Sequence, residues 1–331
     1  MTSTYKSAGV NIEAGDETVK RIKGHAKSTF SKNVLSGIGL FGAFYKPDLK
    51  KYKNPVLVSS VDGVGTKLKI AFAMNRHDTI GQDLVNHCVN DIAVCGAKPM
   101  YFLDYLAFGK LHPEKAEKII KGFSIACRQN NCSLIGGETA EMPGLYSEEE
   151  YDVSGTIVGI VEKSKIINGK DIKKGDVLIG FPSSGLHTNG YSLARKVLLE
   201  KYKLNDKIDA LSVTLGEELL KVHKSYLYLI KKLSKSIKIK GFSHITGGGI
   251  IGNTIRILPV KFKLKIDWNA WKLPPVFDLI QKTGDVSDDE MRKVFNVGIG
   301  LVTIVSKNKV DKCVEIAKGL KEKPVIIGEV V

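Results

Sequence analysis

The sequence is poor in the features that mark membrane, secreted and zinc-finger proteins. It has five cysteines in 331 residues and no Cys-x-x-Cys pair, so neither a disulfide framework nor a zinc finger is indicated. Its longest apolar runs, such as residues 324–331, have the length of a strand and fall far below the ~20 residues of a membrane span. The first 17 residues are polar and lack the apolar core of a signal peptide. We therefore expect buried free thiols and a cytoplasmic protein.

The charge is strongly positive, with 50 Lys and Arg against 35 Asp and Glu and a net charge of +15. Such an excess suggests a nucleic-acid-binding protein as one alternative. However, the lysines are scattered, and where they crowd, at residues 221–240, they alternate with apolar residues. We therefore expect no nucleic-acid partner and no membrane partner, and the charge favours small anionic ligands.

Strand-like and helix-like segments alternate along the chain, which is typical of α/β and α+β proteins. The length predicts two domains, and the polar stretch at residues 163–176 places them at 1–166 and 167–331. The expected strands are residues 55–60, 100–108, 132–135, 151–162, 177–181, 297–305 and 325–331, with another near residue 262. The expected helices are residues 79–95, 114–130, 191–202 and 215–233, with a further helix after residue 249.

The first segment that indicates chemistry follows the strand at residues 55–60. It reads Asp62, Gly63, Val64, Gly65, Thr66, Lys67. A carboxylate at a strand end suits magnesium, and the glycines let the backbone approach a phosphate. The spacing is not that of a Walker A loop, and a plain glycine turn with a surface aspartate is the alternative.

The second segment is the helix at residues 79–95. Asp83, His87 and Asp91 are spaced at i, i+4 and i+8 and share one face, with Asn86 and Asn90 beside them. Carboxylates beside amides suit a hydrated magnesium ion, which takes one or two protein carboxylates. The alternative is an ordinary solvated face, and we interpret His87 as a structural histidine.

Three further segments are rich in glycine. Residues 136–143 are expected to form a loop that places Glu138 and Glu141 beside flexible backbone. Residues 183–191 and 246–249 each precede a predicted helix, where backbone amides favour an anion; Asn189 as a plain N-cap is the alternative. Lys23 and residues 37–42 could cover a nucleotide or form flexible surface. Together these segments predict a nucleotide, a second phosphorylated ligand and phosphoryl transfer.

The ordered set of motifs closely resembles the phosphoribosylformylglycinamidine cyclo-ligase (aminoimidazole ribonucleotide synthetase) family, from about Tyr5 to the C-terminus. The motifs are residues 5–10 (YKSAGV), 62–67 (DGVGTK), 88–91 (CVND), 136–144 (GGETAEMPG), 187–193 (HTNGYSL) and 246–249 (TGGG). The resemblance implies an N-terminal α+β domain that contributes to a dimeric β-barrel, and a C-terminal three-layer α/β domain with a mixed sheet. It also implies a homodimer.

The resemblance further implies a ligase of purine biosynthesis that uses ATP and Mg²⁺. Its substrate is formylglycinamidine ribonucleotide, whose ring is closed through an iminophosphate to give aminoimidazole ribonucleotide, ADP and phosphate.

The resemblance also implies roles for individual residues. The implied metal ligands are Asp62, Asp91 and Glu138. The implied nucleotide contacts are Lys23, Asp62, Gly63, Gly65, Thr66, Lys67, Asp91 and Glu138. The implied substrate contacts are Ser184, Gly185, His187, Asn189, Gly247, Gly248 and Gly249. The general base stays open among Asp91, His187 and His244.

One detail departs from the family pattern, and another distinguishes the chain from a related family. Where the family usually has Pro-Thr-Arg/Lys before the tyrosine at Tyr226, this chain has Val-His-Lys-Ser at residues 222–225. This departure removes any substrate contact that the threonine makes. The related selenophosphate synthetases need a reactive cysteine or selenocysteine in a glycine-rich N-terminal segment, whereas the first cysteine here is Cys88.

Overall fold

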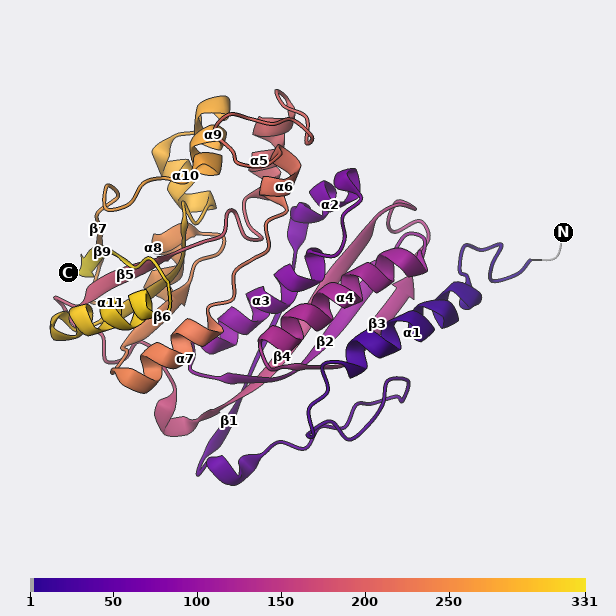
Figure 1. Ribbon diagram of the computed structural model, residues 1–331, viewed down its shortest axis with the longest axis horizontal. Helices are drawn as coiled ribbons and strands as arrows, with labels where there is room; N and C mark the ends of the chain where they lie inside the picture. Colours follow the sequence, from indigo (N-terminus) through magenta and orange to yellow (C-terminus); the bar gives the residue numbers. More distant parts are fainter. Residues whose placement is uncertain (1–2) are drawn as a thin grey trace. The chain divides into compact units, whose positions relative to one another are not determined.

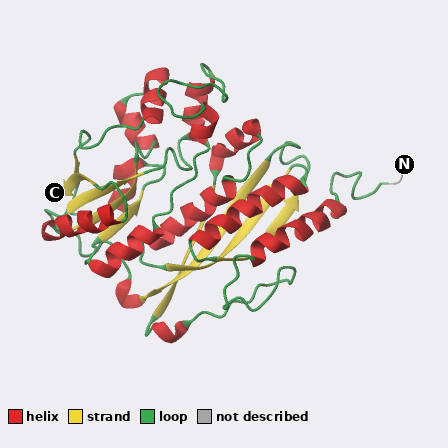
Figure 2. Ribbon diagram, viewed as in Figure 1, coloured by secondary structure: helices red, strands yellow, loops and turns green. Residues whose placement is uncertain are grey.

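The computed structural model describes residues 3–331 and divides them into two compact units. Unit 1 comprises residues 3–92 and Lys98–Lys163, and unit 2 comprises Ala93–Ala97 and Ser164–Val331. Figure 1 labels their elements and Figure 2 colours them by type. Among the described residues, no helix combines the length and the apolar character that a membrane crossing requires.

Unit 1 is built on a four-stranded sheet with the order β1-β4-β2-β3. The strands are β1 (Pro55–Gly63), β2 (Lys98–Phe108), β3 (Ser133–Glu141) and β4 (Tyr151–Glu162). β2 and β3 are parallel, whereas β4 is antiparallel to both β1 and β2. Exposure alternates along β1, as expected for a strand with one covered face.

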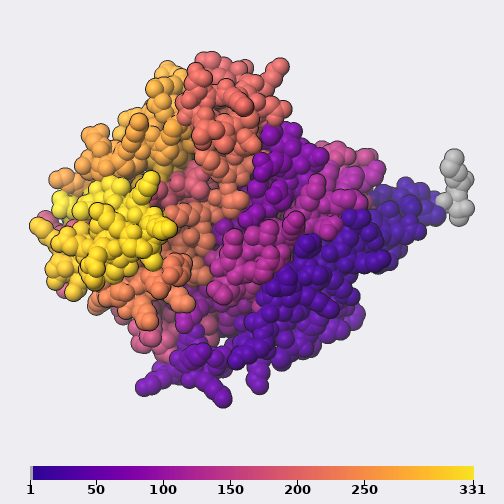
Figure 3. Space-filling model, viewed as in Figure 1, coloured from indigo at the N-terminus to yellow at the C-terminus, as the bar shows by residue number. Residues whose placement is uncertain are grey.

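The helices of unit 1 lie on one side of this sheet and pack very closely (Figure 1). They are α1 (Ile12–Lys27), α2 (Leu68–Met74), α3 (Ile80–Ala93) and α4 (Pro113–Gln129). A Cβ at Gly81 would lie 2.3 Å from the carbonyl oxygen of Ile119, so α3 and α4 meet backbone to backbone. α1 lies beside α4 (Figure 3), and Arg21 on α1 binds Glu117 on α4 at 3.1 Å.

The other face of the sheet carries apolar side chains that unit 1 leaves open. Leu57 and Val61 on β1 are 62% and 65% exposed, and Tyr105 on β2 is 38% exposed. Val61 and Leu103 both pair with Thr156 of β4, so their side chains share this face. An apolar face of this kind marks a surface that favours a partner.

Unit 2 is built on a five-stranded sheet with the order β6-β8-β5-β9-β7. The strands are β5 (Val177–Pro182), β6 (Gly241–His244), β7 (Leu264–Ile266), β8 (Ile299–Val305) and β9 (Val325–Val330). All four pairings described in it are antiparallel. The mixed sheet that the family resemblance implied for this half differs from these pairings, because the motifs that carry the resemblance do not fix strand direction.

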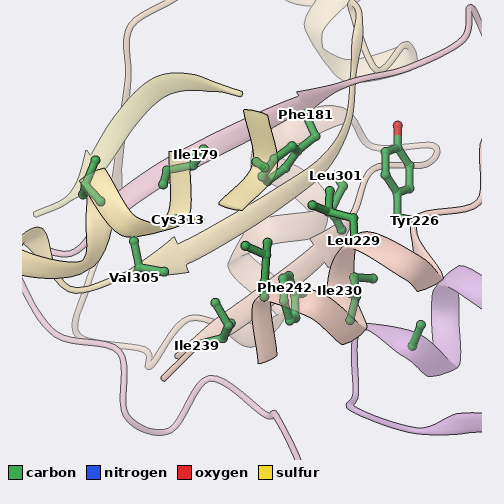
Figure 4. Packing of buried hydrophobic residues seen from close by; sticks show 14 residues of the cluster. Ile179, Phe181, Tyr226, Leu229, Ile230, Ile239, Phe242, Leu301, Val305 and Cys313 are labelled. Carbon is green, nitrogen blue, oxygen red and sulfur yellow. The ribbon is translucent and has the colours of Figure 1, made fainter. Parts of the chain in front are cut away.

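Both faces of the unit 2 sheet are covered, as every residue of β8 is buried. The helices are α5 (Tyr191–Leu199), α6 (Leu215–Leu219), α7 (Leu227–Ser236), α8 (Gly249–Thr254), α9 (Pro275–Gly284), α10 (Asp288–Val294) and α11 (Val310–Gly319). Residues of α7 and α11 form one core with Ile179, Phe181 and Phe242 of the sheet (Figure 4). The opposite face buries Leu178, and this half therefore has three layers.

Two expected elements differ from the structure. The helix expected at residues 215–233 is two helices, α6 and α7, separated by residues 220–226. The loop expected at residues 136–143 is largely strand, because β3 continues to Glu141. Five helices that the sequence analysis did not identify complete the two units, namely α1, α2, α9, α10 and α11.

Candidate functional site

Two of the three predicted metal ligands meet in unit 1, at the end of β1 and on α3. His87 Nε2 lies 2.9 Å from Asp62 Oδ2 and 3.8 Å from Asp91 Oδ2. The hydroxyl of Ser60 donates to Asp91 Oδ2 at 3.0 Å, and Asp62 Oδ1 accepts the backbone amide of Gly63 at 2.7 Å. Both carboxylates therefore converge on one ring nitrogen.

The electrostatics of this cluster favour a charged Asp62 beside a protonated His87. Burial works to lower the pKa of His87, but the hydrogen bond with Asp62 and the charge of Asp91 outweigh it and raise the pKa. Burial likewise works to raise the pKa of Asp62, but the hydrogen bond with His87, the charge of His87 and the amide of Gly63 together outweigh it and lower the pKa. Because Asp91 repels the Asp62 carboxylate, a cation placed between them would relieve that repulsion.

The donor set fits a magnesium ion. Mg²⁺ prefers oxygen ligands and takes one or two carboxylates with several waters, and Asp62 and Asp91 are such a pair. Both carboxylates are partly exposed, at 42% and 28% of the side chain, so water and a phosphate oxygen can reach them.

The other residues of the 62–67 segment differ in how they are placed. Gly65 has a positive φ of 62° with no atom within 4 Å of a Cβ, and Thr66 is exposed. Lys67 is fully buried, and its ammonium group lies 2.8 Å from Asp83 Oδ2. Its burial does not favour the predicted contact with a nucleotide, and Asp83 faces Lys67 rather than a metal site.

Glu138 is not brought to Asp62 and Asp91. It is exposed on β3 and pairs with Tyr105, which pairs with Ser154, which in turn pairs with Gly63. Three strand spacings place its backbone about 14 Å from that of Gly63. Asp62 is the residue before Gly63 on β1, and successive side chains of a strand point to opposite faces of the sheet. The Glu138 side chain, in the same row as Gly63, therefore lies on the face opposite to that of Asp62.

Two acidic neighbours of Glu138 have other environments. Glu141 accepts the amides of Asn11 at 2.6 Å and Leu111 at 2.8 Å, so it fastens the start of α1. Burial, with the charge of Glu138 adding to it, raises the pKa of Asp104 on β2 to about 7. Sequence patterns did not single out Asp104, although such a perturbed carboxyl often marks a functional position.

The N-terminal candidates lie on the surface of unit 1. Lys23 is exposed on α1, and residues 37–42 belong to a stretch, residues 28–48, without helix or strand (Figure 2). The expectation that Lys23 belongs to flexible surface is corrected, because Lys23 is part of the regular helix α1.

In unit 2 the loop before α5 is held in one shape by its own side chains. The Ser184 amide donates to His187 Nε2 at 3.2 Å, and the Ser184 hydroxyl donates to the carbonyl of Val222 at 2.6 Å. His187 is buried with a positive φ of 63°, a conformation rare for a residue other than glycine. Gly185 is buried and Asn189 is partly exposed at the loop end.

The second glycine loop of unit 2 is fixed by Asn253 of α8. Its side-chain amide donates to the carbonyls of Thr246, Gly247 and Gly249 at 3.3, 3.2 and 2.9 Å. Gly247 and Gly248 are exposed, whereas Gly249 is buried with a positive φ of 64°. The amides of this loop are therefore presented on a rigid frame.

Sequence reasoning missed the residue that connects the two histidines proposed as bases. His223, between α6 and α7, lies with its Nε2 2.9 Å from His244 Nε2 and its ring stacked 3.9 Å from that of His187. The only signal in the sequence was the departure at residues 222–225.

Comparisons with known proteins match each half of the chain to a known domain family. Residues 48–161 match the model of the AIR synthase related protein, N-terminal domain, and residues 173–331 match its C-terminal domain. Phosphoribosylformylglycinamidine cyclo-ligase from Thermoanaerobacter sp. (strain X514) is 54% identical over 99% of this chain and 97% of its own. The enzyme of the same name from Alkaliphilus oremlandii is 51% identical over 100% and 98%.

Solved structures share the fold at low identity. Thiamine-monophosphate kinase from Stenotrophomonas maltophilia superposes with a TM-score of 0.70 at 17% identity, covering 95% of this chain and 93% of that one. Hydrogenase maturation protein HypE in complex with ATP superposes with a TM-score of 0.64 at 14% identity, covering 98% and 87%. With both domain models matched and half the residues identical to those relatives, the chain belongs to the AIR synthase related family, among its phosphoribosylformylglycinamidine cyclo-ligases.

Proposed function

We infer that the chain is a phosphoribosylformylglycinamidine cyclo-ligase, a ligase of purine biosynthesis that uses ATP to close the imidazole ring of aminoimidazole ribonucleotide. Relatives of that name, about half identical over nearly the whole chain, support the activity. The observation that supports the chemistry is the convergence of Asp62 and Asp91 on His87 in unit 1.

We propose that Asp62 and Asp91 hold Mg²⁺ together with the phosphates of ATP, with His87 positioning both carboxylates. The bound ion would neutralise charge between the phosphates. Gly63, Gly65 and Thr66 follow Asp62 directly, and the open, left-handed Gly65 lets the backbone approach a phosphate. Glu138 and Lys23 remain proposed nucleotide contacts from the family resemblance alone.

The proposed course of the reaction is transfer of the γ-phosphoryl group to the formamide oxygen of formylglycinamidine ribonucleotide. This gives an iminophosphate, whose carbon is a better electrophile than that of an amide. The amidine nitrogen then forms the C–N bond, phosphate leaves with the former formamide oxygen, and one proton is lost. Positioning and electrostatic stabilisation supply most of the catalysis in such transfers.

The two loops of unit 2 are proposed to bind the phosphorylated substrate. Ser184, Gly185 and Asn189 lie on the first loop, and the three glycines at residues 247–249 lie on the second. Asn253 holds the second loop by three hydrogen bonds. Preorganised amides lose little entropy when they bind an anion. His187 and His244 are the candidates here for accepting the proton, with Asp91 as the third.

We further propose that residues 1–166 bind ATP and Mg²⁺ and dimerise, whereas residues 167–331 form the substrate domain. The exposed apolar side chains of Leu57, Val61 and Tyr105 support dimerisation through the open face of the unit 1 sheet. A second copy on this face would close the two sheets into the β-barrel that the family resemblance implies. A cytoplasmic location remains a prediction.

The test is an assay with purified protein, Mg²⁺, ATP and formylglycinamidine ribonucleotide. We expect ADP, phosphate and aminoimidazole ribonucleotide in equal amounts, and Asp91→Asn should lower turnover by about a hundredfold or more, the range for losing one preorganised charged contact. Asp209→Asn is the matched control, because Asp209 is an exposed aspartate in unit 2.

The results separate the activity from its proposed site. Absence of the aminoimidazole product with the native chain would refute the function. Normal turnover by Asp91→Asn, with circular dichroism unchanged, would instead remove Asp91 from the site and leave the activity standing.

A further inference from the structure

Three of the seven histidines gather in the interior of unit 2. They are His187 in the loop before α5, His223 between α6 and α7, and His244 at the end of β6. Their exposed fractions are 1%, 0% and 6%. One ring nitrogen from each lies within 4.8 Å of the corresponding nitrogens of the other two. A buried group of three imidazoles is a potential ligand set for a metal ion.

The contacts around the rings bring one nitrogen of His223 to one of His244, whereas the His187 ring lies nearly parallel to that of His223. His223 Nε2 and His244 Nε2 are 2.9 Å apart, the distance of an N–H···N hydrogen bond. On the other side of its ring, His223 Nδ1 lies 3.4 Å from the hydroxyl of Thr188. Such an outer partner fixes the orientation of a ligating histidine. The third ring, that of His187, stacks on His223 with an interplanar angle of 21°.

The backbone leaves room for these rings at one point of the sheet. A Cβ on Gly300 of β8 would lie 2.6 Å from His187 Cε1 and 2.1 Å from the Tyr226 hydroxyl oxygen. Only glycine at position 300 therefore allows His187 to lie against the strand. The imidazole group is thus part of the packed interior of unit 2 and not an accidental surface cluster.

The chemistry of the donors selects the metal. Magnesium prefers oxygen ligands, whereas imidazole nitrogens suit Zn²⁺ and its neighbours in the first transition series. Two nitrogens bound to a tetrahedral Zn²⁺ at about 2.0–2.1 Å are separated by about 3.3 Å. The His223–His244 pair would have to open by only a few tenths of an ångström, releasing to solvent the proton shared by its two nitrogens. The His187 ring would rotate toward the ion and give up its hydrogen bond from the Ser184 amide.

We propose that His187, His223 and His244 form a Zn²⁺ site with three protein ligands and one open coordination position. Its donors are imidazole nitrogens, whereas the donors proposed for Mg²⁺ in unit 1 are carboxylate oxygens. His223 lies in the segment that departs from the Pro-Thr-Arg/Lys pattern of the family, so the site depends on a residue that this pattern lacks. His187 lies on a loop proposed to bind substrate and His244 is a candidate base, so, on that proposed function, bound Zn²⁺ inhibits the enzyme.

The test measures Zn²⁺ binding to the full chain by calorimetry, after chelation and with the cysteines kept reduced. We expect one Zn²⁺ per chain. His223→Thr, which restores the threonine of the family pattern, should weaken binding by more than the about 10–100-fold that loss of an outer-sphere partner costs. His25→Gln is the matched control, since His25 lies on α1 and pairs with Glu117.

Cobalt supplies a readout of the ligands themselves. Co²⁺ in the site should give the visible d–d absorption of a tetrahedral ion without the charge-transfer band of a cysteine ligand, and His223→Thr should abolish it. His244→Gln, checked for fold by circular dichroism, is a second variant with the same expected loss. Equal Zn²⁺ affinity in the native chain and in either folded variant, no binding by the native chain, or a thiolate band would each overturn the proposal.

Discussion

Lys67 and Asp83 form an ion pair with no exposed side-chain surface, with Nζ–Oδ distances of 2.9 and 2.8 Å. Burial lowers the pKa of Lys67, and the Asp83 charge opposes that change. Removing one partner leaves a buried charge without its main compensation. We therefore expect Lys67→Met to lower the free energy of unfolding by about 3–5 kcal/mol, measured by urea denaturation.

Lys69 provides the matched control because it is two residues away and pairs with Glu150 on the surface. Lys69→Met should cost at most about 1 kcal/mol, as exposed ion pairs do. The double change Lys67→Met with Asp83→Leu should recover most of the loss, because no buried charge then remains. If Lys67→Met costs no more than Lys69→Met, the pair does not stabilise unit 1.

Single residues could be predicted from the sequence where local spacing brings them together. Asp91 and His87 are one helical turn apart, so their meeting follows from local spacing, whereas Asp62 was grouped with Asp91 through the family resemblance. By contrast, the position of Glu138 depends on the order of the strands in the sheet. His223 is 21 residues from His244 and 36 from His187 along the sequence. No local period reports such contacts, which only the packing of unit 2 creates.

His77 connects two elements of unit 1, because it lies between α2 and α3 and its Nδ1 is 2.9 Å from the hydroxyl of Tyr151 at the start of β4. Burial, with the charges of Lys115 and Lys118 adding to it, lowers the pKa of His77 from 6.5 to about 4. In the unfolded chain His77 takes up a proton below pH 6.5, whereas in the folded chain it does so only near pH 4. The stability contributed by its neutral form is thus fully present above pH 6.5 and is lost as the pH falls toward 4.

We expect that loss to be about 2–3 kcal/mol. Urea unfolding of the native chain and of His77→Gln at pH 7.5 and pH 4.5 measures it, since the variant lacks the titrating group. The free-energy difference between the two proteins should shrink at the lower pH. A difference that is constant or grows at pH 4.5 contradicts the proposed cause.

At the level of elements, patterns identified the strands well and failed where tertiary contacts compete with helix formation. The periodic apolar residues of 215–233 predicted one helix. In the structure, the hydroxyl of Tyr191 binds the carbonyl of Leu219 and that of Ser184 binds the carbonyl of Val222. These carbonyls are satisfied by side chains, so the helix ends and begins again at Leu227. β3 was cut short in the prediction because its glycines are typical of loops.

For the whole molecule, the alternation of strands and helices predicted two α/β halves but not the direction of their strands. The parallel pair β2 and β3 is joined by α4, which the sequence predicted, whereas every pairing described in unit 2 is antiparallel. Pairing partners are set by which faces pack together, and this information is spread over the chain. At this scale, the open apolar face of the unit 1 sheet is the feature that favours a binding partner as its occupant.

We expect that occupant to be a second copy of the chain, so sedimentation should give a dimer at micromolar concentration. Val61→Glu should weaken the dimer by at least about a hundredfold, because a two-fold interface buries the new carboxylate twice at a cost of about 1.4 kcal/mol or more each. Val260→Glu is the control, since Val260 is fully exposed in unit 2 and should leave the dimer intact. A native chain that sediments only as a monomer, or a Val61→Glu dimer as tight as the native one, means that this face is not the interface. In that case the apolar side chains of Leu57 and Val61 face solvent or another partner, and the barrel does not form.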